Sequence, residues 1–215
     1  MAVAPINRFL TIGVPVAPGE QILYSAPVGV SAILLYAQVA NVAAGSTYPK
    51  VTFSHKRKTN KTGNIRENRI VKGVEVPPDD TLVMIDGRLV LERTALISDS
   101  IAITGIQSGT VGIYTCEYDH LSGITTIVTV DAHNFSEGDE ITMSGLEFIC
   151  PSNISITTSI FPDPQNSFTV TNVGNSTEFI TNTGVIGFAH TYQSGGQVAP
   201  LQMEFLCSIL ENSLV

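Results

Sequence analysis

The chain has 215 residues, of which 43% are hydrophobic and 14% are charged, and its formal net charge is −8 at pH 7. That length can bury one large core or two small ones. No stretch approaches the ~20 apolar residues that a membrane-spanning helix needs. Residues 1–10 lack the basic leader and apolar core of a signal peptide, so we expect no membrane contact and no secretion.

The positive charge is confined to one part of the chain. Arg93 is the last basic residue, and eight of the 11 Lys and Arg residues lie between Lys50 and Lys72. Residues 94–215 contain 12 acidic residues and no Lys or Arg. This asymmetry indicates a surface for a partner or for self-assembly.

The pattern of apolar residues predicts short strands in the first half of the chain. Apolar residues alternate, or come in short runs, between turn signals, and almost no helical period is present. The predicted strands are 21–24, 31–39, 51–55, 70–76, 81–85, 88–92, 100–104 and 112–118. Asp86-Gly87 stands between two of these runs and predicts a tight hairpin. Residues 56–69 have few apolar side chains, and we predict an exposed loop there.

The amino-acid composition changes between Asp119 and Gln197, where the chain is rich in Thr, Ser and Asn. This part begins with a turn-like Asp-His-Leu-Ser-Gly at 119–123 and ends at Ser194-Gly-Gly. Its predicted strands are 125–130, 140–144, 146–150, 167–171 and 178–181. A final strand follows, with one apolar face made by Leu201, Met203, Phe205, Cys207 and Ile209.

These segments predict an all-β protein with two domains. Residues 1–118 and 198–215 form an antiparallel β-sandwich, and residues 119–197 form a second small β domain inserted into it. The alternative is two consecutive domains, with the final strand belonging to the second.

No motif indicates catalysis, a metal or a cofactor. The four histidines have no metal-ligand spacing, and the three cysteines match no zinc pattern. Ser136-Glu-Gly-Asp-Glu140 lacks the order of a calcium loop, and we expect an exposed turn that uses Gly138. The chain has no nucleophile elbow and no phosphate-binding loop. We therefore expect a protein that is not an enzyme, with reduced cysteines.

The basic segment is the candidate site. Its residues are Lys56, Arg57, Lys58, Lys61, Arg66, Arg69 and Lys72. Three interpretations remain open: an arm that docks on an acidic neighbour, an inert solvated loop, or a nucleic-acid contact across residues 50–72. No aromatic residue lies between Lys56 and Lys72 to stack on bases. We favour the docking arm, with residues 94–215 as an acidic surface of the kind it needs.

Two sets of motifs resemble known proteins. Tyr-Ser-Ala-Pro-Val-Gly at 24–29, Asp-Gly-Arg-Leu-Val-Leu-Glu at 86–92 and Ser-Ile-Leu-Glu at 208–211 resemble small β-sandwich virion proteins of tailed bacteriophages. Gly-Ile-Thr-Thr-Ile-Val-Thr-Val at 123–130, His-Asn-Phe-Ser-Glu-Gly-Asp at 133–139 and His-Thr-Tyr-Gln-Ser-Gly-Gly at 190–196 are similar to a β module in structural proteins of marine myovirus-type phages, such as cyanophages.

The resemblance implies a virion structural protein: a capsid decoration, neck or tail component assembled in the host cytoplasm. Its expected partners are other virion proteins and further copies of itself as a homo-oligomer, and neither family supplies catalytic residues. The rival functions are a particle-displayed adhesin for host-surface glycan and a nucleic-acid-binding accessory protein that uses the basic segment. The absence of Trp and the 7% content of aromatic residues offer little to a sugar site.

Overall fold

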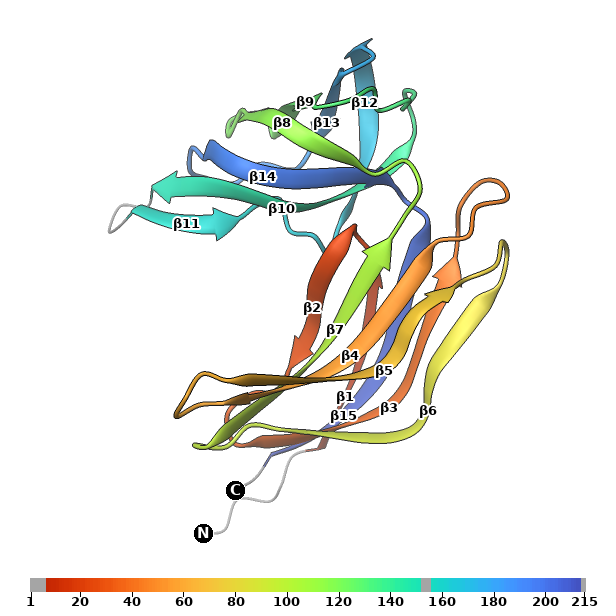
Figure 1. Ribbon diagram of the computed structural model, residues 1–215. Helices are drawn as coiled ribbons and strands as arrows, with labels where there is room; N and C mark the ends of the chain where they lie inside the picture. The colour runs from red at the N-terminus through yellow and green to blue at the C-terminus, as the bar shows by residue number, and fades with distance from the viewer. Residues whose placement is uncertain (1–6, 152–155, 214–215) are drawn as a thin grey trace. The chain divides into compact units, whose positions relative to one another are not determined.

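The computed structural model describes residues 7–151 and 156–213, and these residues form strands and loops without a helix. The all-β class predicted from the sequence is thus confirmed. The chain divides into two compact units (Figure 1). Unit 1 comprises residues 1–14, 20–105 and 203–215, and unit 2 comprises residues 15–19 and 106–202.

Unit 1 contains two four-stranded sheets, in the orders β1-β15-β3-β6 and β2-β7-β4-β5. The strands are β1 (Asn7–Pro15), β2 (Gly19–Ser25), β3 (Val30–Asn41), β4 (Lys50–Thr59), β5 (Ile65–Glu75), β6 (Thr81–Glu92), β7 (Ile97–Ile106) and β15 (Met203–Ser213). Phe53 of β4 stacks on Phe205 of β15 with ring centroids 5.9 Å apart. The Tyr24 hydroxyl of β2 donates to Glu211 Oε1 of β15 at 2.7 Å. The sheets therefore pack face to face, as in a β-sandwich.

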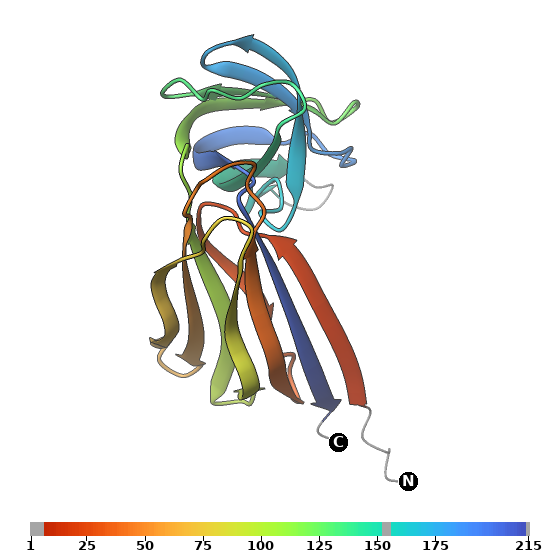
Figure 2. The same cartoon turned by 90° about the vertical axis from the view of Figure 1, so that its right-hand side faces the viewer.

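β15 is a central strand of its sheet, between β1 and β3 (Figure 2). Met203, Phe205, Cys207 and Ile209 are all buried, which confirms the predicted alternation over these four positions. Its pairing with β3 runs from Met203↔Asn41 to Ser213↔Val30. The last strand therefore belongs to the sandwich and not to the second unit.

The hairpin predicted at Asp86-Gly87 is wrong. β6 runs through both residues as one strand and pairs with β3 along its length. Leu34 lies opposite Leu89 and Tyr36 lies opposite Asp86, so two residues of β6 face one residue of β3. This is a β-bulge. A long neighbouring strand supplies hydrogen bonds to both halves of β6, and a bulge accommodates the Asp-Gly pair without a chain reversal.

The exposed loop predicted over residues 56–69 is also wrong in its structure. β4 and β5 form a hairpin whose pairing runs from Lys50↔Glu75 to Lys58↔Ile65. Only residues 60–64 lie outside the strands. β5 is an edge strand with nine of its 11 residues exposed, so its backbone pairing with β4, and not an apolar face, keeps it extended.

Unit 2 holds a seven-stranded sheet in the order β11-β10-β12-β13-β9-β8-β14, in which β10 also pairs with β14 (Figure 1). Its strands are β8 (Val111–Tyr118), β9 (Ile124–Thr129), β10 (Glu140–Pro151), β11 (Ile156–Ile160), β12 (Ser167–Asn175), β13 (Glu178–Asn182) and β14 (Thr191–Pro200). Its core includes Ile127, Ile141, Met143, Phe148 and Phe179, each fully buried.

The boundaries of the two units differ from those of the predicted domains. The prediction placed 106–118 and 198–202 in the sandwich, but both stretches lie in unit 2. β8 pairs with β9 and with β14, which holds it in this unit. β14 runs through the Ser-Gly-Gly at which the predicted insertion ends, and the two strands predicted over 140–150 are one strand, β10.

Across the described ranges, no helix is long and apolar enough to cross a membrane.

Candidate functional site

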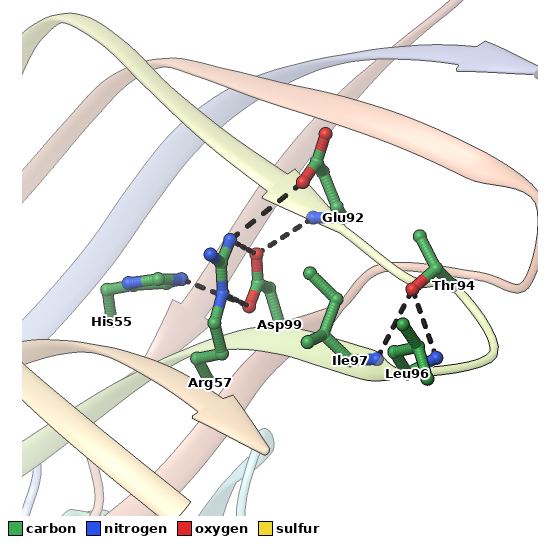
Figure 3. A network of polar contacts seen from close by, with 7 residues as sticks. All are labelled: His55, Arg57, Glu92, Thr94, Leu96, Ile97 and Asp99. Atoms are coloured by element: carbon green, nitrogen blue, oxygen red, sulfur yellow. Dashed lines mark hydrogen bonds and ion pairs between the residues drawn. The ribbon is translucent and has the colours of Figure 1, made fainter. Parts of the chain in front are cut away.

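An ion pair holds the basic hairpin, here defined as β4, β5 and residues 60–64, against β7. The Asp99 side chain of β7 is fully buried. Arg57 of β4 donates to it twice, from Nε to Oδ1 at 2.7 Å and from an Nη to Oδ2 at 2.6 Å (Figure 3). The Glu92 N–H donates to Oδ2 at 3.0 Å, and His55 Nε2 lies 3.5 Å from Oδ1. Asp99 thus connects three strands: β4, β6 and β7.

The charges of this network are set by opposing effects. Burial by itself would raise the pKa of Asp99, but the Arg57 hydrogen bonds, the Glu92 N–H and the nearby positive charge lower it below its usual range. The hydrogen bonds to Asp99 raise the pKa of Arg57, although its burial acts the other way. Both groups are therefore charged at neutral pH, and Arg57 pairs with Asp99 within the same chain.

The tip of the hairpin is also anchored. Asn60 Nδ2 donates to the carbonyls of Thr94 at 3.0 Å and Ala95 at 3.4 Å, and its Oδ1 accepts from Ser98 Oγ at 2.9 Å. The Asn60 N–H donates to the Leu96 carbonyl at 2.9 Å. The turn that receives these bonds is itself closed by Thr94 Oγ1 (Figure 3). The basic segment is thus a fixed hairpin and not a loose arm.

The predicted site residues fall into two groups. Three of them pair within the chain: Lys56 with Glu20, Arg57 with Asp99, and Arg69 with Glu67. The other four are exposed and form no ion pair within the described ranges: Lys58, Lys61, Arg66 and Lys72. The second group leaves positive charge available to a partner.

A pocket of about 400 Å³ lies beside the hairpin and is lined by residues of β2, β4, β5 and β7 and by Arg93. Its cationic lining residues are Lys56, Lys58 and Arg93, and Asn60, Ser98 and Ser100 add polar groups. Arg93 is not among the predicted site residues, because it follows β6 and lies outside the basic segment in sequence. The backbone bridge between Arg93 and Ser98 brings it there, and no local motif signals that pairing.

The two units differ sharply in charge. Unit 1 contains all 11 Lys and Arg residues and ten of the acidic residues, a net charge of +1. Unit 2 contains nine acidic residues and no Lys or Arg. Its densest acidic segment is the exposed turn at residues 136–140, called here the acidic turn, which carries Glu137, Asp139 and Glu140.

The acidic turn has the shape expected from its sequence. Gly138 adopts a positive φ of 92°, and its N–H donates to the Val170 carbonyl at 2.9 Å. The Ser136 N–H donates to Asp139 Oδ2 at 2.8 Å, and the Asp139 N–H donates to the Ser136 carbonyl at 3.1 Å. The Asp139 carboxylate therefore closes the turn, and Glu137 and Glu140 are exposed where the turn leads into β10.

His133 and His190 of unit 2 take part in packing, and Cys116 of unit 2 and Cys207 of unit 1 are buried. His133 accepts from the Phe135 N–H at 2.9 Å and stacks on the Phe135 ring. His190 contacts Cys150 Sγ and stacks on Phe161, and burial lowers its pKa. All three cysteines are free thiols. Burial raises the pKa of Cys116 to about 12 and that of Cys207 to about 11, so neither is a ready nucleophile at neutral pH.

Among the described residues, no group of three or more His, Cys, Asp and Glu side chains is placed to hold a metal ion.

Comparison with known proteins yields no family. No family model matches the chain, and no curated protein matches it. Among solved structures, T=1 particles derived from infectious bursal virus align over 99% of this chain with 9% identity and a TM-score of 0.29. The chain spans about 40% of that structure's length. The N-terminal CBM22-1–CBM22-2 tandem of Paenibacillus barcinonensis Xyn10C aligns over 87% of this chain and 80% of its own, with 10% identity and a TM-score of 0.21. At these TM-scores neither likeness assigns a function.

Proposed function

We propose that this chain is a structural protein of a bacteriophage virion, a capsid decoration, neck or tail component that acts through protein–protein contacts. The observation that carries the proposal is the division of charge between the units. Unit 1 presents a fixed cationic hairpin, and unit 2 carries nine carboxylates without a basic residue. Opposite potentials on separate surfaces steer association and select its register. The motif resemblance adds the virion context.

The strand edges of unit 1 support the same proposal. β5 and β6 each end a four-stranded sheet, and nine of the 11 residues of β5 and six of the 12 residues of β6 are exposed. Exposed apolar residues on these strands include Ile65, Ile70, Val83 and Val90. An edge strand is a template for pairing with another chain unless it is covered. Symmetric assembly with further copies, as in a homo-oligomer, would cover such edges.

A nucleic-acid contact is the second candidate, because four cations of the hairpin have no ion-pair partner among the described residues. Such a contact would rest on phosphate neutralisation alone, since the hairpin between Lys56 and Lys72 has no aromatic ring for base stacking. Binding would then show no sequence preference and would fall steeply with salt.

Cryo-EM and mass spectrometry of nuclease-treated, purified particles of the encoding phage test the proposal. We expect the chain in repeated copies, with density for both units and with its hairpin against another virion protein. Absence of the chain from the particle would overturn the virion function. Its release by nuclease alone would favour the nucleic-acid alternative.

A further inference from the structure

We infer that the pocket beside the hairpin receives the acidic turn of a second copy of this chain, so that successive copies join pocket to turn. This inference rests on the proposed structural function and names one contact that would serve it. It follows from the free charge in the pocket, from the shape of the acidic turn and from the presence of both on one chain.

The pocket holds positive charge that the chain does not neutralise. Lys58 and Arg93 line it from β4 and from the turn after β6, and both side chains are exposed. Neither forms an ion pair within the described ranges. The two carboxylates in the lining already have partners, Glu20 with Lys56 and Asp99 with Arg57. The pocket therefore favours an anionic occupant, and its volume is within the ~300–1,000 Å³ common for ligand pockets.

The acidic turn is suited to enter such a pocket. Glu137, Asp139 and Glu140 lie within four residues, and all three are exposed. Asp139 closes the turn by accepting the Ser136 N–H, while Glu137 accepts from the Asn172 side chain and Glu140 from the Thr169 side chain. The turn is thus ordered before it binds, which lowers the entropic cost of association. Exchange of neutral donors for Lys58 and Arg93 would give charge-assisted hydrogen bonds.

A second copy supplies this occupant without any other protein. Each copy presents one cationic pocket and one acidic turn, and the contact uses a different surface on each side. Contacts of this kind are heterologous: they generate a ring if the rotation closes and a filament if it does not. Repeated subunits around a tail or neck need such contacts.

Two charge-reversed variants test the inference by sedimentation velocity on nuclease-treated protein. The pocket variant carries Lys58→Glu and Arg93→Glu, and the turn variant carries Glu137→Lys and Glu140→Lys. We expect wild-type protein to self-associate at low salt and to dissociate as NaCl screens the contact. Each variant alone should associate roughly tenfold or more weakly than wild type.

The mixture of the two variants is the decisive sample. The pocket variant keeps a native acidic turn, and the turn variant keeps a native pocket. A native turn can therefore meet a native pocket, and the reversed pocket and reversed turn also carry opposite charges. The mixture should recover the association that each variant alone has lost. Matched controls reverse the same number of charges elsewhere: Arg66→Glu with Lys72→Glu on the hairpin, and Glu117→Lys with Asp131→Lys on unit 2. Both controls should associate like wild type.

Three results would overturn the inference: a monomeric wild type at all concentrations, variants that associate like wild type, or a mixture that recovers no association. Thermal unfolding of each variant confirms that it is folded, and the single changes Lys58→Glu and Glu137→Lys replace any double variant that is not. If the chain is found in particles but fails this test, the virion function stands and only the self-contact falls. If it passes but is absent from particles, the reverse holds.

Discussion

At the scale of single residues, Asp99 determines where the hairpin lies. Its carboxylate is removed from solvent and receives two hydrogen bonds from Arg57 and one from the Glu92 N–H. A buried carboxylate is tolerated only when its charge is compensated in this way. Loss of Arg57 would leave the buried Asp99 carboxylate without its countercharge, and loss of Asp99 would leave the Glu92 N–H without its acceptor.

Replacement of Asp99 should therefore cost much more than replacement of an exposed acid. We expect Asp99→Ala to lower the free energy of unfolding by about 2–4 kcal/mol, because it removes a charge-assisted pair and orphans the Glu92 N–H. Glu75→Ala is the control, because Glu75 pairs with Lys50 at 3.3 Å on the surface. It should change stability by less than about 1 kcal/mol. Urea unfolding measures both, and equal losses would contradict this account.

The contribution of Asp99 to stability should depend on pH. The pKa of Asp99 is lower in the folded chain than in the unfolded one, so the unfolded state binds the proton more readily. Its stabilising effect is full above the ordinary pKa of Asp, ~3.9, and is lost as the pH falls through the lowered value. The stability difference between pH 6 and pH 3 should be smaller in Asp99→Asn than in wild type. An unchanged difference would show that other carboxylates govern the acid response.

At the scale of elements, the hairpin depends on contacts remote in sequence. β4 and β5 pair locally, but Asn60 fixes the tip to the carbonyls of Thr94 and Ala95. A two-stranded hairpin is only marginally stable by itself. The position of the exposed cations therefore follows from the turn at residues 94–97 as much as from the hairpin's own sequence.

Loss of this anchor should loosen the tip without unfolding unit 1. In Asn60→Ala we expect faster amide hydrogen exchange over residues 58–66 and a stability loss of about 1 kcal/mol, since its hydrogen bonds are partly exposed. Asn64→Ala serves as the control, because it changes the same residue type in the same exposed turn. If both variants exchange alike, Asn60 does not anchor the hairpin.

Local sequence patterns predicted some elements correctly and others wrongly. Alternation correctly identified Met203, Phe205, Cys207 and Ile209 as one buried face, because alternating residues of a strand point to opposite sides. Asp86-Gly87 has the composition of a tight turn, yet it forms a bulge. Whether a turn-forming pair reverses the chain depends on the strand beside it, and β3 is not adjacent to β6 in sequence.

At the scale of the whole molecule, the charge is divided between units that each have their own core. Nine carboxylates without a Lys or Arg make unit 2 self-repulsive, whereas unit 1 is close to neutral. Like charges destabilise a compact state, and salt relieves the repulsion as the Debye length falls from ~30 Å at 0.01 M to ~8 Å at 0.15 M.

Salt should therefore stabilise unit 2 selectively. Between 10 and 150 mM NaCl we expect the amides of unit 2 to gain protection from hydrogen exchange, while those of unit 1 change little and act as the internal control. The comparison is made on dilute protein, where self-association is absent. A uniform gain in both units would show that ionic strength acts through something other than the acidic charge.

The sequence by itself determined the all-β class, the buried face of the last strand, the closed acidic turn around Gly138 and the separation of charge along the chain. These features depend on residue type and short spacing. Only the tertiary structure decided that the basic segment is a fixed hairpin and that Arg57 pairs with Asp99. It also decided that Arg93 and Lys58 line one pocket and that the units divide after residues 105 and 202. β4 and β5 pair locally, but the anchoring of the hairpin and the other outcomes depend on contacts between segments far apart in sequence, which no local pattern encodes.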